Sequence, residues 1–414
     1  MRILHWYQNF LGGGGVANAV LGLTNGQSRL GQDVLLAAME NHQPPLYEPL
    51  APHLECKILT WRPRVNRRLG NLEIVVPERS LIARLNNWRP DIVHIHGEFL
   101  PSNIWASRTL RCPAVLSSHG AFHPRLLESG SGKRRLFPQL YLRFAKAVFY
   151  RRLLAFHALS TVEERLVRKM VPGANVYRLP QGPPIHVQQL LKLNGNNHDR
   201  RDNGSCRLIY VGRLDVHTKG LDILLRAFAQ AIKSLPFEGV SLSLVGPDWR
   251  GGLEELRRLA GQLGIEDRVK FTGPMRAENV MQLLHEADLF LLLSRNEGVS
   301  ISLAEALLAG LPALVSTEVG SLTFPEIASL PHVISVKPEL EAVRAAIIHC
   351  LKHVRELKLS AEAHAPQVAS FFDWSRIAAL HIQKYREFLG DRVVAGVRRP
   401  IAEPGIPPTP LYFL

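Results

Sequence analysis

Cysteine and long hydrophobic runs are both scarce in this sequence of 414 residues. The four cysteines are scattered and form no C-x-x-C pair: Cys56, Cys112, Cys206 and Cys350. This pattern argues against a cysteine metal site and is typical of a reducing compartment. No segment reaches the ~18 apolar residues of a membrane-spanning helix. The apolar part of the N-terminal segment is too short for a signal peptide, so we expect a cytoplasmic protein.

Acidic residues are also in deficit, because 36 Asp and Glu stand against 50 Lys and Arg, which leaves a net charge of +14. Nucleic acid, an anionic membrane surface or a polyanionic substrate would each match this charge. The sequence contains no zinc finger, RNP aromatic motif or basic zipper, so we expect no nucleic-acid partner. A hydrophobic fraction of 46% is enough for a core in each of the two domains that this length predicts.

Short apolar runs alternate with helical segments, most regularly over residues 207–316, which predicts a parallel sheet flanked by helices. The polar stretch 195–205 is the clearest linker. Helices are expected over Glu339–Lys358 and Ser375–Leu389 near the end of the chain. We predict an α/β protein organised as follows: a Rossmann-like domain 1–185, a linker 186–206, a second Rossmann-like domain 207–374, a helix 375–395 and a proline-rich, extended tail 396–414.

Residues 289–316 are the most informative stretch. The apolar run Leu289–Leu293 predicts a buried strand, and Ser300 is a good N-cap for a helix that ends at Leu308. Glu297 lies in the loop and Glu305 lies on the helix. The free backbone N–H groups at the start of this helix suit a phosphate group. Alternatively, the two glutamates are ordinary loop and helix carboxylates without a ligand.

The spacing of Glu297 and Glu305, followed by the turn Gly310–Pro312, resembles the E-x7-E motif of the retaining glycosyltransferases of family 4, also called group 1. The resemblance covers about residues 1–390. It implies the GT-B fold, in which two doubly wound Rossmann-like domains face each other across a cleft and a C-terminal helix returns to the first domain. It implies that Glu297 orients the transferred sugar as a catalytic residue and that Glu305 binds the ribose. The residues implied to receive the donor at the helix start are Ser300, Ile301 and Ser302.

Three further loops of the second domain match this reading. Arg213 and Lys219 stand in the form G-R-L-x4-K-G, and the resemblance places both on the diphosphate of the donor. Positive charge there would replace a metal ion in stabilising the leaving group, so we predict no metal. Gly246 lies in a glycine turn that is expected to face the same cleft, and Met275 lies in the loop that is implied to hold the base. The alternative is that these are surface charges without a ligand.

In the first domain, residues 12–17 formally fit the dinucleotide pattern G-x-G-x-x-A, but five residues separate them from the preceding strand. The resemblance instead implies that Gly13 and Gly14 lie against the phosphates and the sugar of the donor. His119, followed by Gly120, stands where the family often has His-Asp, in a pattern similar to enzymes of bacterial surface polysaccharides. It is implied to contact the sugar as a catalytic residue; otherwise it is a turn histidine.

His94 and His96 lie on one face of a predicted strand. A metal site there would need a third ligand, for which only His119 or His123 is plausible. We favour a different reading, in which His94 is a core histidine with satisfied hydrogen bonds and His96 faces the cleft.

A basic segment spans residues 124–169, where eleven Lys and Arg stand against three Glu, with aromatic residues between them. Such a segment suits an anionic lipid surface or a lipid-diphosphate acceptor. A solvated basic face over an ordinary core helix is equally compatible. The segment leads us to expect peripheral association with the inner face of the membrane.

The sequence therefore predicts a retaining glycosyltransferase that moves a hexosyl group from a nucleoside diphosphate sugar, such as a GDP- or UDP-hexose. The acceptor would be a hydroxyl of a glycan or lipid-linked glycan in surface polysaccharide biosynthesis. No cofactor beyond the donor is expected. The alternatives are a GT-B nucleotide-sugar epimerase and a non-catalytic scaffold at the membrane.

Overall fold

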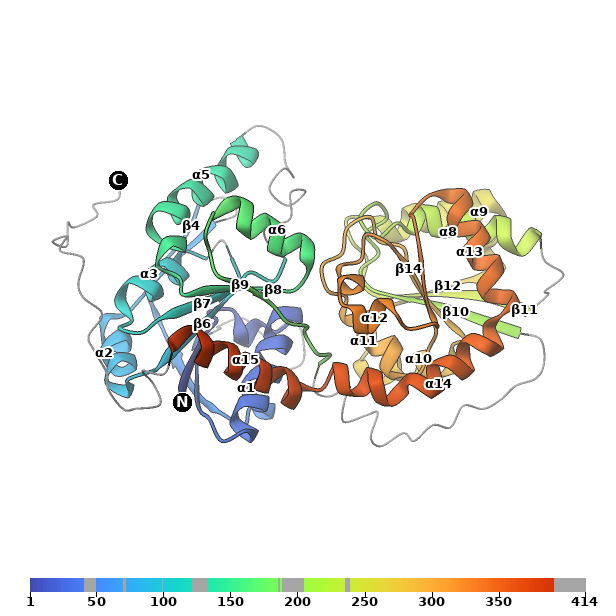
Figure 1. Ribbon diagram of the computed structural model, residues 1–414. Coiled ribbons are helices and arrows are strands. Elements are labelled where there is room, and N and C mark those ends of the chain that lie inside the picture. The colour runs from blue at the N-terminus through green and yellow to red at the C-terminus, as the bar shows by residue number, and fades with distance from the viewer. Residues whose placement is uncertain are drawn as a thin grey trace.

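The computed structural model describes residues 1–40, 50–69, 72–98, 100–120, 133–184, 187, 205–234 and 239–390. These residues form two α/β domains that lie side by side (Figure 1). Across the described parts of the chain, no helix combines the length and the apolar character that crossing a membrane would require. The tail 396–414 and nearly all of the predicted linker 186–206 lie outside the described residues.

The first domain is built on a seven-stranded parallel sheet with the order β3-β2-β1-β6-β7-β8-β9. Its strands are buried Val, Ile, Leu and Ala runs, as expected for a parallel sheet covered on both faces. The strands are β1 (Arg2–Trp6), β2 (Asp33–Met39), β3 (Lys57–Trp61), β6 (Ile92–His96), β7 (Ala114–Ser117), β8 (Ala155–Ala158) and β9 (Val176–Arg178).

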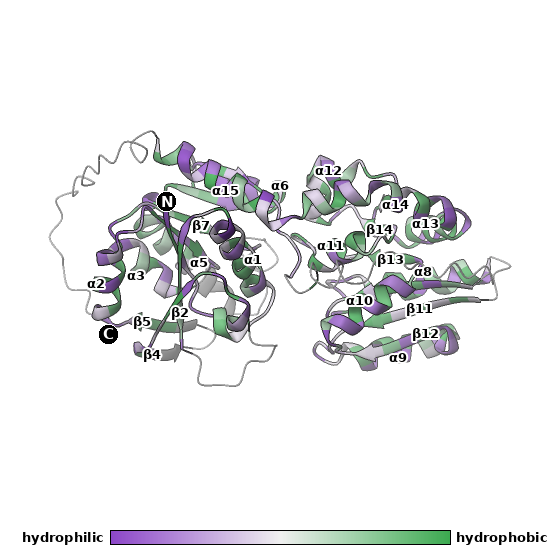
Figure 2. Ribbon diagram, turned by 90° about the horizontal axis from the view of Figure 1, so that it is seen from below, coloured by the Kyte–Doolittle hydropathy of each residue, from purple (hydrophilic) through white to green (hydrophobic). Residues whose placement is uncertain are grey.

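Helices cover both faces of this sheet (Figure 1). Sequence patterning did not predict the antiparallel hairpin of this domain, whose two strands lie side by side in Figure 2. The hairpin joins β4 (Pro63–Leu69) to β5 (Leu72–Pro77). The helix α3 was also missed, because its short segment has no clear apolar period. The helices are α1 (Gly15–Arg29), α2 (Arg79–Trp88), α3 (Pro101–Thr109), α5 (Lys133–Val148) and α6 (Thr161–Met170).

The second domain has a six-stranded parallel sheet with the order β12-β11-β10-β13-β14-β15, which confirms the predicted parallel sheet. The strands are β10 (Ser205–Val211), β11 (Gly239–Val245), β12 (Val269–Gly273), β13 (Leu289–Leu292), β14 (Ala313–Ser316) and β15 (Val333–Val336). The helices around it are α8 (Leu221–Lys233), α9 (Gly252–Leu263), α10 (Ala277–Glu286), α11 (Ile301–Leu308), α12 (Pro325–Ala328) and α13 (Leu340–Lys352). In Figure 2 the helices carry purple and green residues side by side, as amphipathic helices do.

The prediction of a single helix over Glu339–Lys358 is wrong. The chain leaves helical geometry at His353, and α14 (Val354–Phe371) begins there in a new direction. Cys350 before the break and Leu357 after it are both buried in the same hydrophobic core. The change of direction therefore lets both α13 and α14 pack an apolar face on this core. Periodicity alone does not reveal such a break, because both segments have the same apolar spacing.

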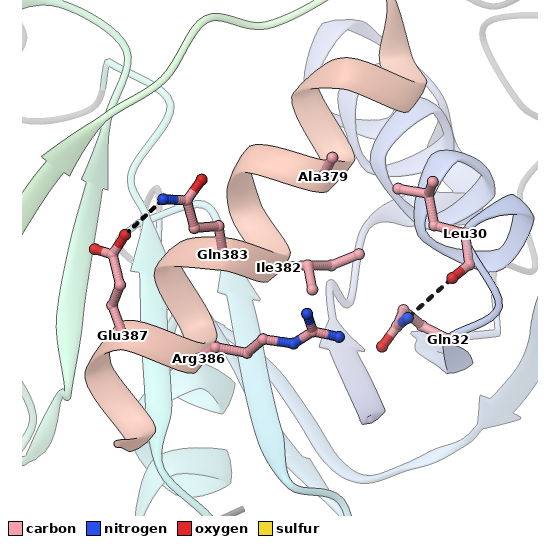
Figure 3. A pocket seen from close by; sticks show the side chains of 7 residues that line it. All are labelled: Leu30, Gln32, Ala379, Ile382, Gln383, Arg386 and Glu387. Carbon is pink, nitrogen blue, oxygen red and sulfur yellow. Dashed lines mark hydrogen bonds between the residues drawn. The ribbon is translucent and has the colours of Figure 1, made fainter. Parts of the chain in front are cut away.

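The last helix, α15 (Trp374–Leu389), follows the second domain but packs on α1 of the first, along the lower edge of Figure 1. Trp374 anchors it, since its indole nitrogen donates to the backbone oxygen of Pro183 at 2.8 Å. The ring lies against Gly22, where an added Cβ would come within 2.0 Å of it. A pocket of about 400 Å³ lies at the far end of this seam, between the end of α1 and α15 (Figure 3).

Candidate active site

The predicted donor-binding residues of the second domain all follow the carboxyl ends of its strands. Strand order reverses between β10 and β13, and ligands of open α/β sheets bind at such a switch point. The loop after β10 carries Arg213 and Lys219, and the loop after β13 carries Glu297. The first sheet reverses between β1 and β6, and its glycine-rich loop follows β1.

Lys219 and Glu297 meet at this switch point as an ion pair between Nζ and Oε2. Their side chains are only 14% and 16% exposed, so the pair is shielded from water. Ser294 Oγ donates to the same carboxylate oxygen at 3.3 Å. The backbone of Glu297 is held as well, because its carbonyl accepts from Gly320 N–H at 2.9 Å. The carboxylate therefore has a fixed position.

Arg213 presents its guanidinium to solvent while the flat face of that group lies 4.3 Å above the ring centroid of Trp249. Stacking on an aromatic ring orients the guanidinium without using its N–H groups. Tyr210 fixes the backbone below, since its hydroxyl donates to the carbonyl of Arg213 at 2.8 Å. The N–H fork of Arg213 thus remains available for an anion.

Gly246 allows two loops to touch. It has a φ of 143°, and a Cβ there would lie 2.0 Å from the carbonyl oxygen of Gly212. A side chain at this position would therefore push the Arg213 loop away. Met275, in the next loop, is 38% exposed and follows Gly273, whose φ is 72°.

The start of α11 offers the predicted anion-binding end. The Oγ of Ser300 caps the helix by accepting from Leu303 N–H at 3.2 Å, and it lies 3.1 Å from Ser302 Oγ. Ile301 reaches the other domain, because a Cβ on Gly15 would lie 3.3 Å from its Cδ1. The glycine loop of Gly13 and Gly14, both at positive φ, leads directly into Gly15.

Glu305 lies on α11, one turn inside the helix, where its side chain is partly buried. Burial raises the pKa of this carboxyl from 4.5 to about 7. Among the residues described, no cation or hydrogen-bond donor contacts it. A buried carboxyl without a hydrogen-bond donor is stabilised by a ligand whose hydroxyl groups donate hydrogen bonds to it.

His119 stands at the corresponding edge of the first sheet, directly after β7, with a φ of 53°. Left-handed geometry is unusual for a residue other than glycine, so surrounding contacts must hold it. Glu163 supplies them: its buried carboxylate accepts from Ser118 Oγ and, at 2.8 Å, from Gly120 N–H. Glu163 was not among the predicted site residues, although the spacing Ser160-x-x-Glu163 is that of a helix capping box.

The two domains meet through loops that follow the strands β8 and β14. Thr161 N–H donates to Thr323 Oγ1 at 3.3 Å, and a Cβ on Gly320 would lie 2.9 Å from Ser160. A cavity of about 320 Å³ lies at the junction, beside Arg178, Phe324 and Arg376. His119 and the Lys219–Glu297 pair thus belong to loops on the facing edges of the two domains.

His94 is a core histidine, as favoured: it is fully buried, and Tyr385 and Ser117 bond its two nitrogens. His5, and not His119, is the third histidine near both members of this pair. A ring nitrogen of His5 lies within 4.8 Å of ring nitrogens of His94 and His96. His5 was missed because its partners are remote in sequence. Both of its nitrogens are already hydrogen-bonded, which argues for a polar network here. His123 lies outside the described residues.

Arg295 and Asp222 form a second contact that sequence reasoning missed. Two parallel hydrogen bonds of 2.8 and 2.7 Å join them, and Arg295 also donates to the carbonyl of His217 at 2.7 Å. These bonds tie the loop after β13 to the loop after β10. They keep Glu297 and Lys219 in register.

Comparisons with known proteins agree with this architecture. Residues 13–184 match Glycosyltransferase Family 4, and residues 205–353 match Glycosyl transferases group 1. The chain is 26% identical over 315 residues to GDP-mannose:cellobiosyl-diphosphopolyprenol alpha-mannosyltransferase of Xanthomonas oryzae pv. oryzae (strain PXO99A), covering 74% of this chain and 77% of that protein. A protein of the same name from Komagataeibacter xylinus is 27% identical over 320 residues, covering 72% of each.

Among solved structures, HepE of Anabaena in complex with UDP and glucose aligns with a TM-score of 0.66 at 20% identity, covering 94% of this chain and 100% of that one. The fold is GT-B, as the resemblance implied. The chain belongs to the family 4, or group 1, glycosyltransferases and is an enzyme of that class.

Proposed function

We propose that this enzyme transfers a hexosyl group, with retention of anomeric configuration, from a nucleoside diphosphate hexose to a lipid-linked glycan. GDP-mannose is the first donor to test and a polyprenyl diphosphate glycan is the first acceptor, because the curated relatives act on that combination. The observation that carries the proposal is the shielded Lys219–Glu297 pair at the switch point, beside the solvent-facing fork of Arg213.

The charges of these groups match the reaction. Cleavage of the sugar–phosphate bond leaves negative charge on the diphosphate and positive charge on the sugar. Arg213, Lys219 and the N–H groups that begin α11 stabilise the first. Donor binding draws Lys219 to the phosphate, and the Glu297 carboxylate then holds hydroxyl groups of the sugar. The leaving phosphate accepts the acceptor's proton.

Binding of the donor is tested by thermal unfolding with a panel of nucleoside diphosphate sugars. A donor at 100 times its dissociation constant stabilises the native state by ~2.7 kcal/mol. Product analysis with a labelled glycan acceptor then reports the linkage, and the anomeric coupling in its NMR spectrum reports the stereochemistry. We expect a retained anomer and full activity in EDTA. An inverted product, or epimerised donor without transfer, refutes the proposal.

We further propose that the enzyme acts at the cytoplasmic face of an anionic membrane. Helix α5 buries Tyr141 and Ala145 on one side and exposes Arg143 and Phe144 on the other. An exposed aromatic ring beside cations suits a lipid interface. The remaining exposed cations of the described part of this segment are Arg151, Arg152, Arg165, Arg168 and Lys169. Residues 124–132 of the predicted basic segment lie outside the described residues.

Sedimentation with anionic vesicles tests the membrane proposal. Binding should weaken in high salt, because each basic residue near the surface contributes ~1 kcal/mol that salt screens. Replacing Arg151 and Arg152 by Glu should release the protein. The matched control changes Arg257 and Arg258, which are exposed on α9 of the other domain. Equal binding of both variants would remove this surface from the proposal.

A further inference from the structure

A chain of buried polar side chains runs through the first domain from the backbone of Leu179 to His119. Hydrogen bonds join every step except the one between Tyr385 and Gln27, where the two side chains interact but Gln27 Nε2 makes no hydrogen bond within the described residues. The members of the chain come from four strands, two helices and the loop after β7, and most are fully enclosed. In order from Leu179 the side chains are His157, Ser117, His94, Tyr385, Gln27, His5, His96 and His119. Such a chain has a direction, because each link needs one donor and one acceptor.

The imidazoles in this chain are neutral. Burial lowers the pKa of His5 and His157 to about 4 and that of His119 to about 3. Burial also holds the pKa values of His94 and His96 well below the usual 6.5. A neutral imidazole has one N–H donor and one acceptor nitrogen, so fixing one nitrogen fixes the other.

The polarity begins at the Leu179 carbonyl oxygen, which can only accept. His157 Nε2, at 3.1 Å, must therefore carry the proton, and its Nδ1 accepts from the Ser117 hydroxyl at 2.7 Å. The hydrogen of Ser117 is then used, so its oxygen accepts from His94 Nε2–H at 2.6 Å. His94 Nδ1 consequently accepts from the hydroxyl of Tyr385.

This order fixes the orientation of the Gln27 amide. With its hydrogen committed to His94, the Tyr385 oxygen can only accept, so the NH₂ group of Gln27 belongs on its side. Gln27 interacts with this hydroxyl and partly offsets the rise in the Tyr385 pKa that burial causes, although its Nε2 atom makes no hydrogen bond within the described residues. The amide oxygen then faces His5 Nε2, as the 2.8 Å contact to Oε1 requires.

The second half of the chain carries this polarity to the active site. His5 Nε2–H donates to Gln27, so His5 Nδ1 accepts from His96 Nε2–H at 2.9 Å. His96 Nδ1 in turn accepts from His119 Nε2–H at 3.2 Å. His119 Nδ1 is left as a bare acceptor, and it has no hydrogen-bond partner within the described chain. Gln181 is a further side chain that interacts with this ring.

We propose that this chain locks His119 as the neutral Nε2–H tautomer, so that its Nδ1 accepts a hydrogen bond from a hydroxyl group of the transferred sugar. The sugar contact rests on the proposed function, whereas the tautomer does not. His5, Gln27, His96 and Tyr385 are then positioning residues that act through His119. A site that can only accept selects a sugar hydroxyl over a fluorine or keto oxygen at the same position.

Nitrogen NMR of the protein with ¹⁵N-labelled histidine tests the tautomer directly. The His119 signals are assigned by their loss in a His119→Gln variant. We expect a protonated Nε2 and an unprotonated Nδ1 throughout pH 6 to 8. A protonated Nδ1, a mixture of tautomers, or titration within that range overturns the proposal, whether or not the enzyme transfers sugar.

Tyr385→Phe tests the remote origin of the lock. It removes the hydroxyl that orients Gln27 and leaves the ring in place, with Gln27, His5 and His96 between it and His119. We expect a mixture of His119 tautomers and a fall in kcat/KM in proportion to the lost Nε2–H fraction, about twofold for an equal mixture. Tyr177→Phe is the matched control, since Tyr177 bonds His381 outside the chain. A pure tautomer in Tyr385→Phe, or an equal mixture in Tyr177→Phe, overturns this origin.

Donor analogues separate the sugar contact from the tautomer. A deoxyfluoro donor, modified at the hydroxyl that contacts His119, should lose kcat/KM with the wild type. The same analogue should lose much less kcat/KM with His119→Ala, because this variant has no Nδ1 acceptor for the sugar hydroxyl. Equal losses for both enzymes at every hydroxyl of the sugar, with the expected tautomer intact, refute the sugar contact and leave the lock standing.

Discussion

Lys219 and Glu297, 78 residues apart in the chain, form a shielded ion pair where the strand order of the second sheet reverses. Each satisfies the charge of the other in the structure described here. In the proposed function, a diphosphate competes for Lys219, and its binding releases the Glu297 carboxylate toward the sugar. On that proposal, donor binding and preparation of the carboxylate are one event.

Glu297→Ala should lower kcat by roughly 10²- to 10³-fold, the usual effect of removing one group that stabilises charge in a transition state. Donor binding should change little, because Lys219 remains for the phosphate. Steady-state kinetics and donor-induced thermal shifts measure the two effects separately. Glu318→Ala, at an exposed position after β14, is the control. Near-normal turnover in Glu297→Ala would contradict the assignment.

Arg213→Ala should reduce kcat by on the order of 10²-fold, because the leaving diphosphate loses a charged hydrogen-bond donor. Trp249→Ala should cost less, since Arg213 keeps its charge and loses only its support. Arg250 provides the comparison, because it lies 5.4 Å from the same Trp249 ring and outside the loop after β10. If Arg250→Ala lowers kcat as much as Arg213→Ala does, stacking on the Trp249 ring is responsible and the N–H groups of Arg213 have no special role.

Glu305 should make donor affinity depend on pH. Its pKa of about 7 means that the carboxylate form fades as the pH falls below 7, so the KM for the donor should rise from pH 8 to pH 6. Glu305→Gln should have a higher KM that varies much less with pH. Rates measured at saturating acceptor across this range test it, with Glu254→Gln on the surface of α9 as control.

Glu305 should also make stability depend on pH. Stability should fall as the pH rises, whereas donor affinity should improve. The folded pKa lies above the unfolded value of 4.5, so the folded state is favoured below pH 4.5 relative to higher pH. That advantage, of the order of 3 kcal/mol for a shift from 4.5 to about 7, disappears as the pH rises through 7. Glu305→Gln should therefore gain stability relative to wild type between pH 5 and pH 8, which urea unfolding can measure.

The buried histidines should make the protein labile in acid. Folded pKa values near 4 against 6.5 unfolded mean that stability is complete above pH 6.5 and is lost as the pH falls toward 4. At pH 5 each such residue costs about 2 kcal/mol. Several of them together approach the whole stability of a typical domain, so we expect acid unfolding between pH 5 and 6.

His381→Leu should reduce the proton uptake on acid unfolding by one, because His381 belongs to the same buried set. The readout is the slope of unfolding free energy against pH, which is independent of any general loss of stability. His353→Leu, at an exposed position, should leave the slope nearly unchanged. A protein that remains folded at pH 4 would contradict the neutral, buried histidines.

Local patterns in the sequence determined the strand–loop–helix unit around Glu297 and Glu305. Its apolar run, its serine cap and the spacing of its two carboxylates are all properties of neighbouring residues, and short-range geometry decides them. The family resemblance then supplied Arg213, Lys219 and His119 as candidates. The helix break at His353 was not predicted, because the apolar residues have the same helical spacing on both sides of it.

Only the tertiary structure decided which remote groups meet. His94 and Tyr385 bond across 291 residues, and Trp374 enters a space that Gly22 leaves open on another domain's helix. No local preference encodes such contacts, since they depend on how sheets order their strands and where α15 docks. The tautomer of His119 is the clearest case. Its imidazole is visible in the sequence, but the proton on it is set by partners that folding alone brings together.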